Sequence, residues 1–125
     1  LDVATDAIFV KDLDNQILFW NKGAERLYGW KSEEVLLKNT QDLLSKKDAT
    51  QQEEALKATL ESGAWQGELH KVTKDGREIL LESHWTLVRD EAGNPKSILI
   101  VDTDITEKKQ LEAKFLRAQR LESLG

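Results

Sequence analysis

Two short, apolar, β-rich runs open the chain, and a cluster of Asp and Asn residues separates them. The runs cover residues 7–11 and 16–20, and their arrangement predicts a β-hairpin. Asn21 follows directly and is well placed as the N-cap of a short helix over residues 22–28, which Gly29 ends. The N-terminal part of the chain is therefore predicted to be a hairpin followed by a helix.

Two further helices are predicted before the pattern becomes that of strands. Ser32 is a candidate N-cap for a second short helix, because acidic residues fill the next turn, where the helix dipole favours negative charge. Asp48 opens the longer middle helix, because Gln51 three residues later completes a capping-box pattern, and Gly63 stops this helix.

From Trp65 onward the hydrophobic period is two, which predicts strands. Residues 65–73 and 77–89 flank an Asp-Gly pair, which is a strong hairpin signal. In the longer of these strands one face is apolar apart from Ser83, and it consists of Ile79, Leu81, Ser83, Trp85 and Leu87. Residues 96–103 are apolar on both faces, as expected of a central strand. The predicted fold class is therefore α+β, with antiparallel strands and a helical insert.

The end of the chain has a helical pattern with a narrow apolar stripe. Its members recur at spacings of four, three and three, and they are Leu111, Phe115, Ala118 and Leu121. A stripe this narrow, with charged neighbours, is typical of a coiled-coil seam and favours a partner helix over packing onto its own domain. We therefore expect a homodimer through this helix. Asp104, Ile105 and Thr106 join the last strand to this helix, and Asp104 with Glu107 resembles an N-cap.

Composition narrows the functional classes. The 125 residues suit one domain, and the net charge of −5 argues against nucleic acid as a partner. The absence of Cys excludes disulfides, thiolate metal sites and cysteine nucleophiles. Apolar runs such as Ile98–Val101 are far shorter than a membrane span needs, so we expect a cytoplasmic segment, whose parent protein could be membrane-attached elsewhere. Because the chain has no Met and begins at Leu1, we expect it to be a piece of a longer protein.

Several motifs, in order and at the right spacing, resemble those of the PAS sensory domain family over roughly residues 5–108. They are Asp6-Ala7-Ile8, Asn21, Ala24-Glu25, Tyr28-Gly29-Trp30, Glu33-Glu34-Val35, Trp65-Gln66-Gly67-Glu68, Lys74-Asp75-Gly76, Asp90 with Gly93, and Asp104-Ile105-Thr106 with Glu107. The resemblance implies a five-stranded antiparallel sheet with short helices over one face, a candidate ligand cavity between the layers, and output through the C-terminal coiled-coil helix. Because Asp104, Ile105 and Thr106 join the sheet to that helix, we expect these three residues to relay the signal. We divide the chain into a PAS sensory domain, residues 1–106, and a signalling helix or linker, residues 107–125.

Residues 116–125 resemble the linker that leads into the dimerisation helix of a sensor histidine kinase. The resemblance implies a kinase domain in cis and a fragment that is not itself an enzyme. The same junction also resembles that of cyclic-dinucleotide enzymes, which stays an alternative for the parent protein. His70 and His84 lie in separate predicted strands without metal-ligand spacing, so we predict no metal site, and no catalytic residue stands out.

A second hypothesis is a receptor for a small molecule or a non-covalent cofactor such as flavin or haem. We expect no required cofactor, although an unknown small ligand would suit the fold. The flavin photochemistry of the family needs a Cys, which is absent, and its haem-binding members generally use a His on the middle helix, which has none. The pocket residues would be Phe9, Asn21, Leu56, Leu60, Ser83, Trp85 and Leu99. Asn21 is explained more simply as a cap, and the Ser83 hydroxyl has backbone or a buried water as alternative partners.

Overall fold

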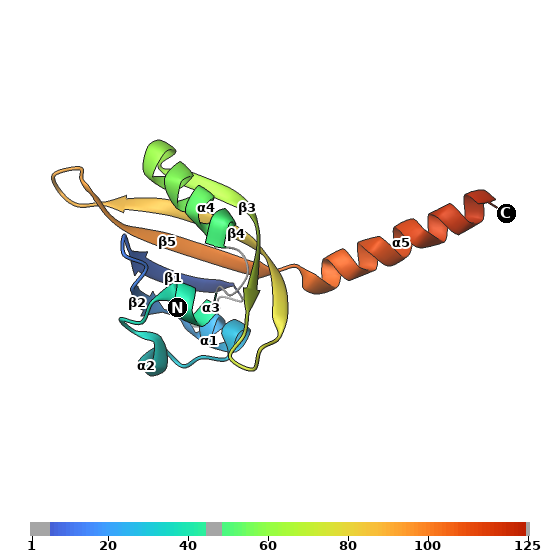
Figure 1. The fold of residues 1–125 in the computed structure, drawn as a ribbon, viewed down its shortest axis with the longest axis horizontal. Coiled ribbons are helices and arrows are strands. Elements are labelled where there is room, and N and C mark those ends of the chain that lie inside the picture. The colour runs from blue at the N-terminus through green and yellow to red at the C-terminus, as the bar shows by residue number, and fades with distance from the viewer. Residues whose placement is uncertain (1–5, 45–48, 125) are drawn as a thin grey trace.

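The fold was analysed in a computed structural model, which describes residues 6–44 and 49–124 (Figure 1). Over these residues a single sheet of five strands is followed by a long C-terminal helix, and short helices lie between the second and third strands. The elements are β1 (Ala7–Asp12), β2 (Ile17–Trp20), α1 (Lys22–Tyr28), α2 (Ser32–Val35), α3 (Thr40–Leu44), α4 (Ala49–Ser62), β3 (Ala64–Val72), β4 (Glu78–Arg89), β5 (Pro95–Asp104) and α5 (Thr106–Leu124).

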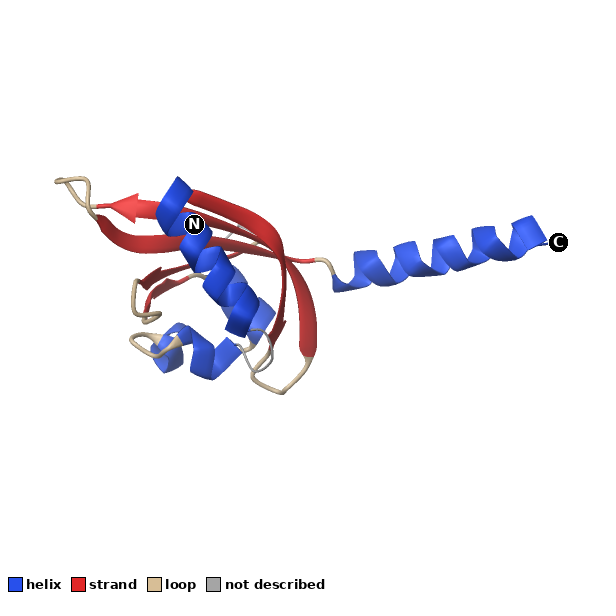
Figure 2. Cartoon of the chain, turned by 45° about the horizontal axis from the view of Figure 1, so that its top comes forward, coloured by secondary structure: helices blue, strands red, loops and turns tan. Residues whose placement is uncertain are grey.

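The strands follow the order β2-β1-β5-β4-β3, and each neighbouring pair is antiparallel. Strand β5 is therefore the central strand, as predicted for residues 96–103. Helices α1 to α4 cover one face of the sheet, whereas α5 leaves the end of β5 and projects away from the domain (Figures 1 and 2). The predicted five-stranded antiparallel sheet with helices over one face is confirmed.

Local sequence signals account for both ends of α1. The Asn21 side chain accepts a hydrogen bond from the Ala24 N–H at 2.8 Å, so Asn21 is the N-cap of α1. Gly29 ends this helix with a φ of 80°, a left-handed conformation that glycine adopts without steric cost. The prediction for Ser32 is wrong, because Lys31 takes the N-cap position and Ser32 is the first residue of α2. Asp48, the predicted start of α4, lies outside the described residues.

The core lies between the sheet and the helices. Phe9, Trp20 and Tyr28 form an aromatic cluster in which Trp20 lies 5.2 Å from Phe9 and 5.3 Å from Tyr28, measured between ring centroids. The predicted inner face of β4 is confirmed, since Ile79, Leu81, Ser83 and Trp85 are all buried and Leu87 is half-buried. Among the described residues, none of the helices is both long enough and apolar enough to span a membrane.

Candidate functional site

Three of the predicted pocket residues lie together on the helix-covered face of the sheet. Phe9, Ser83 and Trp85 are each no more than 1% exposed. Phe9 and Trp85 flank Ile100 from the two strands beside β5, so their side chains share this face. Asn21 lies beside the group, but its side-chain oxygen accepts hydrogen bonds from the Ile8 and Ala24 N–H groups at 2.9 and 2.8 Å. Its role is therefore to join α1 to β1.

Of the other three predicted pocket residues, Leu60 and Leu99 do not line this face, and their assignment is wrong, whereas Leu56 is half-buried and packs against the core. Leu99 lies between the fully buried Ile98 and Ile100 in β5, and because side chains alternate along a strand it points to the opposite face. Leu60 is 38% exposed and, with Leu56, lines an open groove of about 390 Å³ along the surface of α4. The residues that α4 buries most deeply are Gln52, Ala55 and Thr59.

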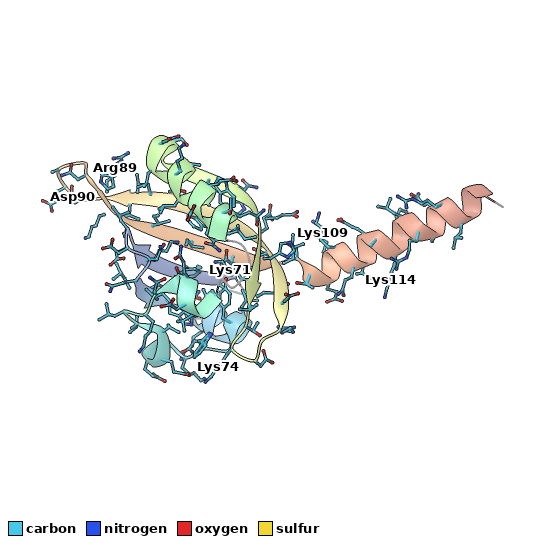
Figure 3. The ribbon with its side chains drawn as sticks, viewed as in Figure 1. Lys71, Lys74, Arg89, Asp90, Lys109 and Lys114 are labelled. Carbon is cyan, nitrogen blue, oxygen red and sulfur yellow. The ribbon has the colours of Figure 1, made fainter. Side chains whose placement is uncertain are left out.

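The centre of the helix-covered face is a buried polar network around the Asp102 carboxylate on β5. This carboxylate accepts hydrogen bonds from the Tyr28 hydroxyl and the Ser83 hydroxyl, and from the Lys71 ammonium at 3.2 Å. The Ser83 oxygen in turn accepts a hydrogen bond from Trp85 Nε1 at 2.9 Å. The Ser83 hydroxyl therefore bonds to two side chains within this network. Lys71 lies beneath the helices, over the middle of the sheet (Figure 3).

A second lysine, Lys11 on β1, reaches the same region. It is 2% exposed, and its ammonium nitrogen lies 4.2 Å from the centre of the Trp85 ring, a cation–π arrangement. Burial, followed by repulsion from Lys71, lowers the pKa of Lys11 to about 7, although the Asp102 charge opposes this shift. Burial and the neighbouring Asp102 charge raise the pKa of Tyr28 well above its usual value, so Tyr28 stays a hydrogen-bond donor at neutral pH.

The sequence interpretation missed Lys11, Lys71, Asp102 and Tyr28. For Lys11, Lys71 and Asp102 the sequence does contain a signal of burial, because each lies at an inward-facing position of its strand. Each follows inward-facing apolar residues at a spacing of two: Ala7 and Phe9 before Lys11, Leu69 before Lys71, and Ile98 and Ile100 before Asp102. Charged residues at inward positions are expected to be paired, because burying an isolated charge is costly. The histidines, by contrast, are exposed in the strands, and no group of three metal-ligating side chains occurs within the described part of the chain.

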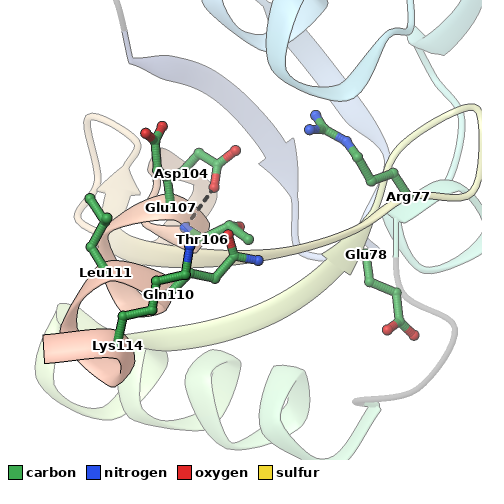
Figure 4. Close-up of a pocket in the computed structure, with 8 residues that line it drawn as sticks. All are labelled: Arg77, Glu78, Asp104, Thr106, Glu107, Gln110, Leu111 and Lys114. Carbon is green, nitrogen blue, oxygen red and sulfur yellow. Dashed lines mark hydrogen bonds between the residues drawn. The ribbon is translucent and has the colours of Figure 1, made fainter. Parts of the chain in front are cut away.

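The junction between β5 and α5 is tied to β4 through the backbone of Leu80. The Ile105 N–H donates to the Leu80 carbonyl oxygen at 2.9 Å, and the Leu80 N–H donates to Thr106 Oγ1 at 2.9 Å. The Asp104 carboxylate accepts a hydrogen bond from the Thr106 N–H at 2.9 Å (Figure 4). The N-cap position of α5 is Ile105. Asp104 lies one residue earlier, and its carboxylate fixes the first turn of the helix through this hydrogen bond.

The rest of α5 is exposed, and its first turn borders an open groove. This groove has a volume of about 670 Å³ and is lined by Arg77, Glu78, Asp104, Thr106, Glu107, Gln110, Leu111 and Lys114 (Figure 4). All four residues of the apolar stripe are exposed: Leu111 by 57%, Phe115 by 62% and Leu121 by 70%, and Ala118 is exposed as well. An ion pair of 3.2 Å between Lys109 and Glu68 links the first turns to β3. The apolar stripe therefore does not pack back onto its own domain.

This architecture defines a small α+β domain whose covered sheet face holds a buried polar site and whose last strand continues into an outgoing helix. The chain belongs to the PAS family, because the PAS fold pattern matches residues 1–105. It is 27% identical over 115 residues to the sensor histidine kinase TmoS of Ectopseudomonas mendocina, an alignment that covers 90% of this chain and 12% of that protein. The chain thus spans about an eighth of the length of this relative.

Solved structures show the same fold. A PAS domain from Colwellia psychrerythraea superposes with a TM-score of 0.80 at 33% identity, covering 85% of this chain and 91% of that one. An RNA-binding light-oxygen-voltage receptor superposes with a TM-score of 0.78 at 25% identity, covering 98% of this chain and 35% of that one. The structural similarity to the receptor extends over nearly all of this chain.

Proposed function

We propose that this chain is the sensory and dimerisation module of a sensor histidine kinase, and that it regulates a kinase domain in the same polypeptide through α5. The module itself carries no catalytic role in this proposal. The similarity to a sensor histidine kinase supports the choice of output, and a kinase domain in cis implies a cytoplasmic location. The observation that carries the proposal is an outgoing helix that is fixed to the sheet at its first turn and bears an unpartnered apolar stripe.

The stripe favours a second copy of the same helix as its partner. Leu111, Phe115, Ala118 and Leu121 recur at the spacing of coiled-coil core positions, and three of them are large apolar side chains that are more than half exposed. Pairing two copies in parallel would place each stripe against its equivalent and remove these side chains from water. A parallel pair also delivers both helices in the same direction, as a dimeric output domain requires.

Signal transfer follows from the way that α5 begins. The hydrogen bonds of Leu80 with Ile105 and Thr106 join the first turn of α5 to β4 as well as to β5. A change in the relative position of these two strands therefore alters the start of the helix directly. In the proposed mechanism the module shifts between two arrangements of this junction, and the paired helices carry the difference to the kinase.

The dimer is tested by charge substitutions on α5. Phe115→Glu places a carboxylate in the stripe, and it should convert the dimer into a monomer in analytical ultracentrifugation. Leu116→Glu is the matched control, because Leu116 is 52% exposed but lies about 100° around the helix from Phe115. The control should stay dimeric, and deletion of residues 111–124 should give a monomer. A wild-type monomer, or equal effects of the two substitutions, would count against the proposal.

A second candidate function is a receptor for a small molecule or a non-covalent flavin, and the likeness to a light-oxygen-voltage receptor supports it. The absence of Cys means that a cysteinyl–flavin adduct cannot form on this chain. An absorption spectrum of the purified protein separates these alternatives. A band above about 350 nm, beyond the absorption of aromatic side chains, would support a bound chromophore, whereas its absence would leave a colourless ligand or none.

A further inference from the structure

The buried network on the covered face of the sheet holds two lysines and one carboxylate. Lys11, Lys71 and Asp102 are 2%, 3% and 1% exposed, so all three charged groups are shielded from water. Lys71 pairs with Asp102 at 3.2 Å, whereas Lys11 forms no ion pair within residues 6–44 and 49–124. The network carries one net positive charge when Lys11 is protonated and none when Lys11 is neutral. The proton of Lys11 therefore decides the net charge of this buried network.

The charged groups that face Lys11 come from two other strands of the sheet. Lys71 on β3 repels the Lys11 charge, and Asp102 on β5 attracts it. The Tyr28 phenol on α1 donates a hydrogen bond to Asp102 and stays protonated at neutral pH. In the part of the chain that the structure describes, the buried residues of β2, β4, α2, α3 and α4 carry no titratable side chain. Burial and Lys71 outweigh Asp102 and lower the pKa of Lys11 to about 7.

The Lys11 side chain connects two strands that are not neighbours in the sheet. It reaches from β1 across the central strand β5 to β4, where its ammonium nitrogen lies 4.2 Å from the centre of the Trp85 ring. A protonated amine is attracted to the electron-rich face of an aromatic ring, and this attraction is stronger in a buried site. A neutral amine lacks the charge on which the attraction depends. Loss of the proton therefore removes an attraction between β1 and β4 that spans β5.

The Trp85 ring in turn is linked to β5, the strand that continues into α5. Its Nε1–H group donates a hydrogen bond to Ser83 Oγ at 2.9 Å, and the Ser83 hydroxyl donates to the Asp102 carboxylate. Further along the same two strands, the Ile105 N–H donates to the Leu80 carbonyl oxygen at 2.9 Å, where α5 begins. The ring that Lys11 contacts and the start of α5 are thus held by one pair of strands, β4 and β5.

We propose that Lys11 is a proton-operated switch of this module, whose charged and neutral forms favour different positions of the β4–β5 strand pair and hence of the start of α5. This inference rests on the proposed function, in which α5 carries the output, and it names protons as an input. In the charged form Lys11 attracts the Trp85 ring and repels Lys71. In the neutral form both forces are absent, so the two forms stabilise different arrangements of the network.

The pH range of the switch follows from the burial of Lys11. With a Lys11 pKa of about 7, the charged form predominates at about pH 6 and the neutral form at about pH 8. A change of about one pH unit on either side of neutrality therefore changes the charge of the network in most molecules.

The test is an NMR titration of the full wild-type chain from about pH 5 to about pH 9. The side-chain ¹³Cε resonance of Lys11 reports its charge, the indole N–H of Trp85 reports the ring, and the backbone amides of Leu80 and Ile105 report the junction. We expect all four signals to shift with one common midpoint near pH 7. A Lys11 resonance that does not titrate between about pH 6 and about pH 8 would overturn the proposal, as would junction amides that do not follow Lys11.

Two substitutions of Lys11 have opposite expected results. Lys11→Arg stays charged over the whole range and should hold the Trp85 and junction signals at their acid positions. Lys11→Met is never charged and should hold these signals at their alkaline positions. Lys74→Met is the matched control, because Lys74 also lies over a tryptophan ring, 5.1 Å from the centre of Trp30, but its side chain is 49% exposed. The control should keep the wild-type titration, whereas a junction response that persists in folded Lys11→Met would overturn the proposal.

The histidines need a control of their own, because histidine side chains in general change charge in the same pH range. His70 and His84 are exposed on the face of β3 and β4 opposite the network. A variant with both replaced by Gln should keep the common midpoint, and loss of the junction response in this variant would overturn the proposal. The dimer assay separates the switch from the proposed function. A dimer whose junction does not respond to pH refutes only the switch, and a monomer whose junction responds refutes only the dimer.

Discussion

Replacement of Asp102 by Asn tests whether the buried network depends on charge or only on shape. Asn has nearly the same volume, and its oxygen can still accept hydrogen bonds from Tyr28 and Lys71, while its amino group can donate to the Ser83 oxygen. The positions of these side chains are therefore largely preserved in Asp102→Asn. What is lost is the negative charge that faces the buried lysines, together with the acceptor of the Ser83 O–H.

The expected cost follows from the burial of the pair. Lys71 is 3% exposed, so water cannot replace the lost carboxylate. Removing one partner of a buried ion pair costs about 3–5 kcal/mol, because the remaining charge is left uncompensated. We expect Asp102→Asn to lower the free energy of unfolding at pH 7 by this amount. Adding Lys71→Met removes the uncompensated charge, so the double variant should recover at least about 2 kcal/mol relative to Asp102→Asn.

The assay is urea denaturation followed by tryptophan fluorescence and circular dichroism, with a double-mutant cycle over Asp102 and Lys71. Glu34→Gln is the control, because it breaks an exposed ion pair with Lys74 and should leave the midpoint unchanged. A loss below about 1 kcal/mol for Asp102→Asn would refute the reasoning. So would additive effects of the two substitutions, since they would show that the charges do not interact.

Two further outcomes follow from Lys11 and Thr106. Burial lowers the Lys11 pKa to about 7 in the folded state, so between pH 7 and about 9.5 the unfolded chain binds more protons than the folded chain. The free energy of unfolding should therefore rise with pH across this window, and less steeply in Lys11→Met. Equal slopes in urea titrations of the two proteins would contradict this. Thr106→Val removes the acceptor of the Leu80 N–H hydrogen bond. Amide hydrogen exchange at Leu80 should therefore accelerate, while α5 stays helical. Unchanged protection of the Leu80 amide would contradict the anchoring role of Thr106.

The sheet was predictable from the sequence because its signals are local. The Asp-Gly turn and the alternation along residues 77–89 are confirmed by the β3–β4 hairpin and by the buried inner face of β4. The apolar pattern of residues 96–103 predicted a central strand, and β5 is the middle strand of the sheet. Helix α3 was missed, since its five residues are too few to show a helical period.

The predicted pocket was only partly correct, because its lining depends on side-chain direction. In a strand that is apolar on both faces the pattern does not show which residues point inward, and the choice of Leu99 therefore failed. In α4 the choice of Leu60 failed, because this side chain lies on the exposed side of the helix. The residues that α4 buries most deeply are Gln52, Ala55 and Thr59, two of them polar, and Leu56 packs half-buried against the core.

The charged network was missed for a related reason, which is that it is defined by long-range pairing. Lys71 and Asp102 are 31 positions apart in the sequence, and only the order of β3, β4 and β5 brings them together. Each residue alone looks like an ordinary exposed charge near a strand end. The inward parity of each residue marks it as unusual, but parity alone does not identify the partner.

The buried network and the output junction occupy the same pair of strands, and this proximity bears on the proposed mechanism. Asp102 pairs across the ladder with Ser83, and Asp104, two residues later on β5, pairs with Leu81. The next backbone contact is that of Leu80 with Ile105 at the start of α5. A change of charge beside Asp102 therefore acts on the strand that continues into the helix. Signal transfer in the proposed function needs a shift of this one strand pair, rather than a route across the domain.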